Sequence, residues 1–185
     1  MSYSDIDRHV CYQPVEGSQM RLHFVAALLA LAGITAVVPA EGLAEDNSLI
    51  GTWALKSFVR EIPGTAERYN QLGEHPQGFL GYSGDGRMYV ILVAGDRIKP
   101  REETPTDEER VKLHKSMIAY AGTYTIEGGK VIHHLDISEN GSRTGSDQVR
   151  FYKLDGDTLA IRTAPNKSPI DGREGVGVLV FERVK

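Results

Sequence analysis

The chain has 185 residues, enough for one domain with its own hydrophobic core, and its 21 basic and 25 acidic residues leave a formal net charge of −4. The basic residues are scattered rather than clustered, which argues against the positive patch of a nucleic-acid-binding protein. The 20 glycines and 8 prolines indicate many turns, as an antiparallel sheet requires.

An uncharged apolar run follows Met20 and spans residues 24–38. This run is short for a membrane span but has the length of a signal-peptide core. Small residues lead up to Ala44, after which we expect cleavage. We therefore predict a signal peptide over residues 20–44 and an exported protein, periplasmic or secreted. A buried or membrane-anchoring helix is the alternative.

Residues 1–19 are polar and aperiodic, and they precede a methionine that could itself start the export signal. We interpret them as an upstream extension from a misassigned start. The only cysteine, Cys11, lies in this extension. The mature chain, residues 45–185, would therefore have neither a disulfide nor a thiol nucleophile, and we expect it not to span a membrane.

Segments of alternating apolar and polar residues follow one another along the mature chain, separated by short turns. This pattern is typical of an antiparallel barrel or sandwich. In the first segment we expect one face to carry Trp53, Leu55, Ser57 and Val59. The expected strands are residues 50–61, 78–83, 87–93, 119–127, 130–139, 148–154, 158–163 and 176–184.

The first and last of these strands carry Trp53 and Arg183. If the sheet closes on itself, the two strands become neighbours and the guanidinium can lie over the indole ring, an interaction worth roughly 0.5–2 kcal/mol. We therefore predict an all-β fold, an antiparallel up-and-down barrel of about eight strands. Small closed barrels commonly hold one small ligand.

One short helix is expected between the third and fourth strands. Thr106 followed by Glu109 three residues later forms a capping-box pattern, with acidic residues in the first turn. The helix should run to about Ser116. We expect Val111, together with Leu113 or Met117, to face inward.

Two adjacent histidines stand out in the fifth strand. Alternation places His133 on one face with Val131, Leu135 and Ile137. An inward His133 could hydrogen-bond a ligand or transfer a proton near neutral pH. The alternative is a core histidine whose ring is satisfied by a tyrosine or a backbone carbonyl.

The opposite face of that strand carries His134 and Asp136, which could pair with each other or with solvent. A metal site would need further ligands, and the other candidates, His75 and His114, lie on a loop and on the helix. We predict neither a metal nor any other cofactor.

Arginine and tyrosine residues on the strands complete the candidate site. Arg150 stands in mid-strand, and an inward arginine would need a carboxylate, either internal or on a ligand. An outward, solvated Arg150 is the alternative, and Arg87 could bind Asp85 of the preceding turn.

Tyrosine side chains can contact flat ligands through the ring, and they also fill barrel cores. We therefore expect about two of the five strand tyrosines to line a cavity, out of Tyr82, Tyr89, Tyr120, Tyr124 and Tyr152. The predicted ligand-binding residues are Tyr82, Tyr89, Tyr120, Tyr124, His133 and Arg150.

Catalytic motifs for serine hydrolases, nucleotide binding and zinc peptidases are absent from the sequence. The first hypothesis is therefore an exported protein that binds a small, largely apolar or aromatic ligand in the barrel. The second is an isomerase or cyclase that acts on a small secondary metabolite through His133, a tyrosine and Arg150. The third is an envelope or interaction protein that uses the barrel as a scaffold.

Five segments of the mature chain resemble the lipocalin-like domain proteins of bacteria and fungi. The resemblance covers nearly all of residues 49–184. It implies a calycin-type β-barrel with a central cavity over residues 45–185, in a group that ranges from carriers to cyclases and isomerases. The segments are Leu49-Ile50-Gly51-Thr52-Trp53-Ala54-Leu55, Pro76-Gln77-Gly78-Phe79-Leu80-Gly81-Tyr82-Ser83-Gly84-Asp85-Gly86-Arg87-Met88, Tyr120-Ala121-Gly122-Thr123-Tyr124, His133-His134 and Gln148-Val149-Arg150-Phe151.

Overall fold

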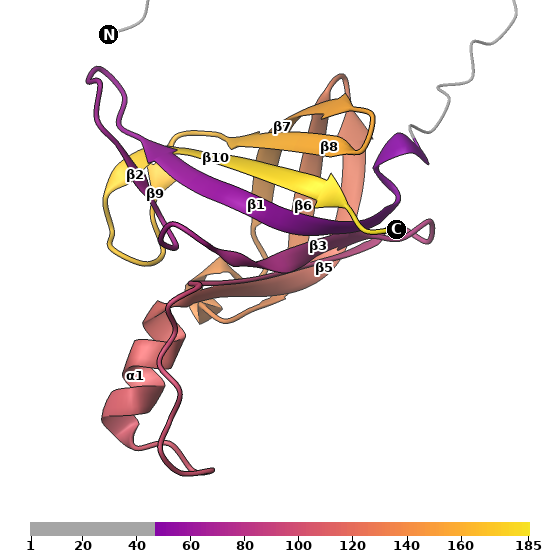
Figure 1. Cartoon of the computed structure of the whole chain (residues 1–185). Helices are drawn as coiled ribbons and strands as arrows, with labels where there is room; N and C mark the ends of the chain where they lie inside the picture. Colours follow the sequence, from indigo (N-terminus) through magenta and orange to yellow (C-terminus); the bar gives the residue numbers. More distant parts are fainter. Residues whose placement is uncertain (1–46) are drawn as a thin grey trace, which may run out of the picture. The chain divides into compact units, whose positions relative to one another are not determined.

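A computed structural model describes residues 47–185 of the chain. The predicted upstream extension (1–19) and signal peptide (20–44) lie outside the described residues. Eight long strands form a closed antiparallel barrel, as predicted (Figure 1). They are β1 (Gly51–Glu61), β3 (Gln77–Tyr82), β4 (Arg87–Val93), β5 (Met117–Glu127), β6 (Lys130–Ser138), β7 (Asp147–Asp155), β8 (Thr158–Thr163) and β10 (Glu174–Arg183).

Among the described residues, two short strands, two 3-10 turns and one helix accompany the eight long strands. Strand β2 (Arg68–Asn70) pairs with the end of β1, and β9 (Asn166–Lys167) pairs with the start of β10. Two 3-10 turns, η1 (Asn47–Leu49) and η2 (Gly141–Arg143), lie before β1 and between β6 and β7, and helix α1 (Asp107–Lys115) lies between β4 and β5. No helix in the described part of the chain has the length and apolar character needed to cross a bilayer.

Pairing between the first and last long strands closes the barrel. Strand β10 (yellow in Figure 1) runs antiparallel to β1 (indigo), with Trp53 opposite Arg183. The Arg183 guanidinium carbon lies 4.0 Å from the centre of the fully buried Trp53 ring. Arg183 also donates to the carbonyls of Ile50 and Ser48, at 2.8 Å each, and the indole N–H donates to Leu49 O at 2.9 Å. These contacts seal one end of the barrel.

The predicted face of β1 is right only as far as Leu55. Leu55 pairs with Phe181 and Ser57 with Val180, so Lys56 is an extra residue in a β-bulge. An extra residue reverses the alternation of side chains beyond it. Phe58 and Arg60 therefore point into the barrel, in place of the predicted Ser57 and Val59.

A second bulge corrects the predicted face of β6. His133 and Leu135 are buried as expected, but Ile137 is 66% exposed. Ala121 of β5 pairs with Ile137 and the next residue, Gly122, with Leu135, which leaves Asp136 as the extra residue. A Cβ on Gly122 would lie 1.9 Å from the His134 carbonyl oxygen, so this close approach of the two strands requires glycine.

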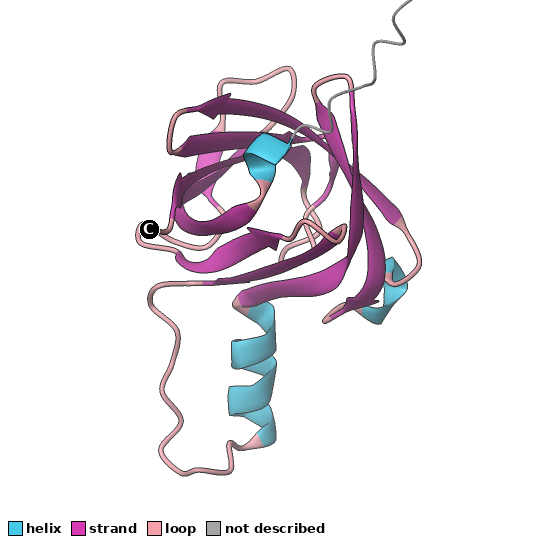
Figure 2. Cartoon of the chain, turned by 90° about the vertical axis from the view of Figure 1, so that its right-hand side faces the viewer, coloured by secondary structure: helices cyan, strands magenta, loops and turns pink. Residues whose placement is uncertain are grey.

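Helix α1 forms where predicted but does not pack as predicted. Thr106 and Glu109 make the capping box, yet no residue of the helix is buried and Val111 is 51% exposed. Leu113 is only half-buried. The helix extends away from the barrel (Figure 2), and Arg97 holds its last turn by donating to Leu113 O and Ser116 Oγ, both at 3.1 Å.

Candidate functional site

A cavity of about 370 Å³ lies inside the barrel. A cavity of this volume suits a small organic ligand. Alternating residues of the strands supply its apolar wall, because every second side chain faces inward. These are Phe58, Leu80, Val90, Leu92, Ile118, Ile161, Leu179 and Phe181.

Polar residues from two connections form the mouth of the cavity. Asn140 and Ser142 come from the segment between β6 and β7, and Lys167 and Ser168 come from the segment between β8 and β10. Ser142 and Lys167 are exposed. The cavity therefore opens at the end of the barrel opposite to Trp53.

The charges that line the cavity are all positive. Arg60, Arg143, Arg150 and Lys167 line it, and no aspartate or glutamate does. Among residues 47–185, none of the three arginines takes part in an ion pair. The internal carboxylate that an inward Arg150 would need is therefore missing from the described residues.

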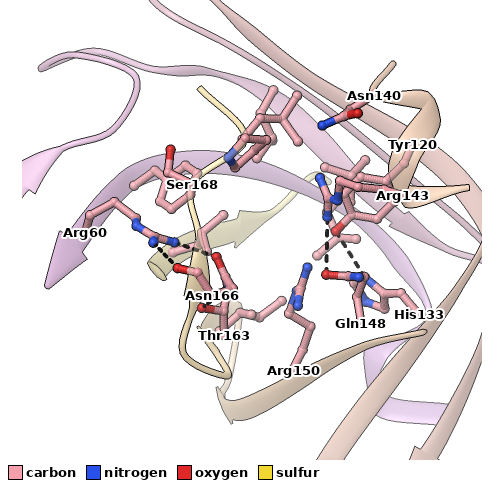
Figure 3. Close-up of a pocket in the computed structure, with 18 of the residues that line it drawn as sticks. Arg60, Tyr120, His133, Asn140, Arg143, Gln148, Arg150, Thr163, Asn166 and Ser168 are labelled. Carbon is pink, nitrogen blue, oxygen red and sulfur yellow. Dashed lines mark hydrogen bonds between the residues drawn. The ribbon is translucent and has the colours of Figure 1, made fainter. Parts of the chain in front are cut away.

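Arg150 of β7 is only 7% exposed. Its Nη1 donates to the carbonyl of the preceding residue, Val149, at 3.0 Å. In Figure 3 its guanidinium lies between the Arg60–Asn166 pair and the group formed by Arg143, Gln148 and His133. The structure thus agrees with the inward orientation of Arg150.

Arg143 approaches the cavity from η2. Its guanidinium carbon lies 5.1 Å from the centre of the Tyr120 ring, and its Nη2 donates to Gln148 Oε1 at 3.4 Å. Burial lowers the pKa of Arg143, and the Arg150 charge lowers it further, while Tyr120 and Glu139 act in the opposite direction. The two cations are therefore close enough to repel each other.

Arg60 has a different surrounding. It is 1% exposed and donates to Asn166 Oδ1 at 2.9 Å, to Asn166 O at 2.7 Å and to Arg173 O at 3.2 Å. Its Nε has no hydrogen-bond partner. Arg60 thus fixes the loop before β10 to the inside of β1 and has few donors left for a ligand.

Each ring nitrogen of His133 is hydrogen-bonded to a tyrosine hydroxyl. The Tyr82 hydroxyl lies 2.7 Å from Nε2, the Tyr120 hydroxyl lies 3.2 Å from Nδ1, and all three residues are buried. Burial, and then the charge of Arg150, hold the pKa of His133 well below its usual range, so the ring is neutral near pH 7. Burial likewise raises the pKa of Tyr82 well above its usual value.

A neutral imidazole has one N–H donor and one acceptor nitrogen, so one of these tyrosines donates to the ring and the other accepts from it. The tyrosine hydroxyl that accepts a hydrogen bond from the ring can donate its own proton to a third group. Of the two, only Tyr120 lines the cavity. The interior chain Tyr82–His133–Tyr120 therefore reaches the cavity with the hydroxyl-bearing side chain of Tyr120.

The structure brings some of the predicted site residues together and separates others. Tyr120, His133 and Arg150 all line the cavity, and Tyr82 lies behind His133. Tyr124 donates to Ser83 O at 3.0 Å and is not among the lining residues. The roles of these side chains as ligand contacts stay predictions.

Tyr89 is a predicted site residue that lies outside this arrangement. It is 40% exposed on the outer wall, because Met88, Val90 and Leu92 are the inward residues of β4. Its ring covers Gly81, where a Cβ would lie 2.2 Å from the ring. Tyr89 therefore does not reach the cavity.

Sequence reasoning missed several cavity residues. Arg143, Asn140 and Gln148 lie in or beside an irregular segment, where no periodicity shows the direction of a side chain. Arg60 was missed because the bulge in β1 reverses the pattern. The sequence Asn140-Gly141-Ser142, a typical turn, was the one available signal for the segment at the mouth.

Charged side chains on the outer wall of the barrel form ion pairs with one another. Asp136 binds Arg87 at 2.6 Å, and His134 binds Asp147 at 2.7 Å and Thr125 at 3.1 Å, so His134 and Asp136 do not pair with each other. The Arg87 backbone N–H, rather than its side chain, donates to Asp85. Within residues 47–185, no three His, Cys, Asp or Glu side chains gather closely enough to hold a metal ion.

Comparison with known proteins gives one family match. The model of the family described as "Lipocalin-like domain" matches residues 50–184. No curated protein matches the chain. One similar solved structure is an uncharacterized protein from Bacteroides eggerthii, with 10% sequence identity and a TM-score of 0.36 over 74% of this chain and 99% of that chain.

Proposed function

The chain belongs to the lipocalin-like domain family, and on that premise we propose that its barrel binds a small, largely apolar ligand. The observation that supports this proposal is the unfilled interior. The cavity of about 370 Å³ has an apolar wall of aliphatic and aromatic side chains, and polar side chains line its remaining walls and its mouth. An apolar wall with a few directed polar groups is the usual make-up of a small-molecule site.

Filling the cavity tests the proposal. Val90→Phe places a phenyl ring on the inner face of β4, whereas Ile91→Phe places the same ring on the outer face, where Ile91 is 51% exposed. We expect the first variant to weaken binding of the neutral fluorophore N-phenylnaphthylamine by about tenfold or more and the second to leave it unchanged. Equal binding by both variants and the parent protein would place the fluorophore outside the barrel.

Native mass spectrometry of the protein purified from its source supplies an independent test. We expect a bound small molecule that is lost on denaturation. An interior that takes up neither a native ligand nor the fluorophore would contradict a binding function.

A second candidate is the isomerase or cyclase activity. The favouring observation is that Tyr120, His133 and Arg150 line one cavity and that Tyr120 is hydrogen-bonded to His133. Arg150 could polarise a carbonyl while the Tyr120 hydroxyl, supported by neutral His133, transfers a proton. For a ligand recovered from the native protein, His133→Gln should abolish turnover and retain binding, whereas equal turnover by the variant would exclude this mechanism.

We also propose that the barrel acts outside the cytoplasm. The motive is the apolar run over residues 24–38 with small residues before Ala44. N-terminal sequencing of protein from the exported fraction should begin at Glu45. A cytoplasmic protein that retains residues 20–44 would contradict export.

A further inference from the structure

We infer that the ligand is an apolar monocarboxylic acid, whose carboxylate is bound by Arg150 and Arg143 and whose hydrocarbon part lies against the apolar wall. The inference rests on the proposed binding function and names its substrate class. It predicts that the site prefers acids to alcohols and amines of the same shape.

The first argument is the unbalanced charge of the interior. A buried cation is costly unless an anion accompanies it. Arg150 is 7% exposed, forms no ion pair within residues 47–185, and donates to the neutral carbonyl of Val149. The cavity beside it contains no acidic side chain. A carboxylate carried in by the ligand would supply the missing negative charge.

The second argument is the position of Arg143. It comes from the β6–β7 connection, on the same side of the cavity as Arg150 on β7, and repulsion between the two charges contributes to the lowered pKa of Arg143. An anion bound near both guanidinium groups would relieve this repulsion. Arg60 is less suited to the role, because its Nη2 and Nη1 already donate to Asn166 and to the Arg173 carbonyl, which leaves mainly its Nε without a partner.

The third argument concerns the remaining polar groups. A carboxylate only accepts hydrogen bonds, and guanidinium groups match its planar shape with paired N–H donors. The Tyr120 hydroxyl and the Gln148 amide line the same side of the cavity and can add donors. The neutral state of His133 leaves the arginines as the cations of this inner wall.

The volume and the apolar lining of the cavity indicate the size of the ligand and the nature of its hydrocarbon part. A cavity of about 370 Å³ accommodates a small ligand, such as a medium-chain acid or a few aromatic rings. The wall opposite the arginines is built from Leu80, Val90, Leu92 and Ile118, which suit a hydrocarbon chain or ring. Decanoate has this size and this division into head and tail.

The test compares decanoate, decanol and decylamine as competitors of N-phenylnaphthylamine. We expect decanoate to bind at least about tenfold more tightly than decanol, because a hydrogen-bonded charge pair is stronger than a neutral contact, and decylamine to bind most weakly. Arg150→Met should lower the affinity for decanoate to that for decanol without changing the affinity for decanol.

Arg162→Met is the matched control. Arg162 lies on the neighbouring strand β8, faces outward and pairs with Glu61, so the variant removes the same charge outside the cavity. It should keep the preference for decanoate. Arg143→Met provides a second variant, which should weaken decanoate severalfold and leave decanol unchanged, whether or not Arg150→Met folds.

The outcomes separate the two proposals. Equal binding of decanol and decanoate, tighter binding of decylamine, or a preference that survives both arginine variants would overturn the carboxylate inference and leave the binding function intact. Tighter binding of decyl phosphate than of decanoate would indicate that the site prefers a phosphate, and it would also overturn the carboxylate inference. Absence of binding by every probe, the fluorophore included, would count against both proposals.

Discussion

Neutral His133, enclosed by two tyrosine hydroxyls and close to a buried arginine, makes the stability of the barrel sensitive to acid. In the unfolded chain a histidine takes up a proton as the pH falls through about 6.5, but burial holds the pKa of His133 in the folded protein well below that value. Between the two pKa values the unfolded state binds more protons. Acid therefore favours unfolding in this range.

We accordingly expect the free energy of unfolding to fall by up to about 1.4 kcal/mol per pH unit as the pH drops below 6.5, and to be insensitive to His133 above it. Urea unfolding at a series of pH values measures this slope. His133→Gln should reduce the slope, and His114→Gln on the exposed helix α1 serves as the matched control. An identical slope in the parent protein and in His133→Gln would contradict the prediction.

Arg183 is the second residue whose contribution can be measured. It covers the Trp53 ring at 4.0 Å and donates to two backbone carbonyls, so Arg183→Met should lower the free energy of unfolding by about 1–3 kcal/mol. Lys56→Met, which breaks an exposed ion pair with Glu182, should cost less than about 1 kcal/mol. Equal costs in urea unfolding would show that the ring contact contributes little.

The direction of His133 was predictable because Val131 and Leu135 alternate regularly around it. That of Arg150 stayed open, because its sequence neighbours Val149 and Phe151 are apolar, and the structure leaves Phe151 48% exposed. Arg60 and Ile137 were not predictable, because each lies beyond a bulge, and the extra residues Lys56 and Asp136 leave no mark in the sequence of one strand. A bulge is defined by the pairing of two strands. Arg143 could not be placed either, since it lies in a turn rather than a strand.

At the scale of elements, α1 shows that a local signal can be right while its packing is not. The capping box at Thr106 fixes where the helix starts, but the first turn alone does not decide whether the helix has a core to join. Helix α1 has no buried residue, and it is held mainly by the hydrogen bonds that Arg97 donates to Ser116 and Leu113.

Because no residue of α1 is buried, the barrel should tolerate its removal. The Ala94 N–H donates to Ser116 O at 2.9 Å, so a short glycine-containing turn can join these two residues in place of residues 95–115. We expect the free energy of unfolding to change by less than about 1 kcal/mol in urea. A loss several times larger would show that the helix supports the barrel.

At the scale of the whole molecule, the seam between β1 and β10 decides whether the cavity exists. The family resemblance and the pair Trp53 and Arg183 predicted closure, and the register of the two strands confirms it. The size of the cavity was not predictable, since it depends on how inward side chains from several strands meet. Packing of this kind has no signature in any one segment.

Hydrogen exchange tests the strength of the seam. We expect the amides in the middle of β1 and β10 to exchange only through global unfolding, like those of β4 and β5, while the amides of α1 exchange rapidly. Faster exchange in β10 than in β4 would show that the barrel opens at this seam. Exchange followed by NMR or mass spectrometry resolves these segments.

The clamp of Arg183 on the carbonyl of Ser48 has a practical consequence, because it holds the two termini of the barrel domain next to each other at the sealed end. A short peptide could join residue 185 to residue 48, and new termini could be opened in the exposed stretch before α1. Such a circular permutant would keep every residue that lines the cavity. An affinity tag or a surface tether attached directly before residue 48 or after residue 185 would likewise leave the mouth free for incoming molecules.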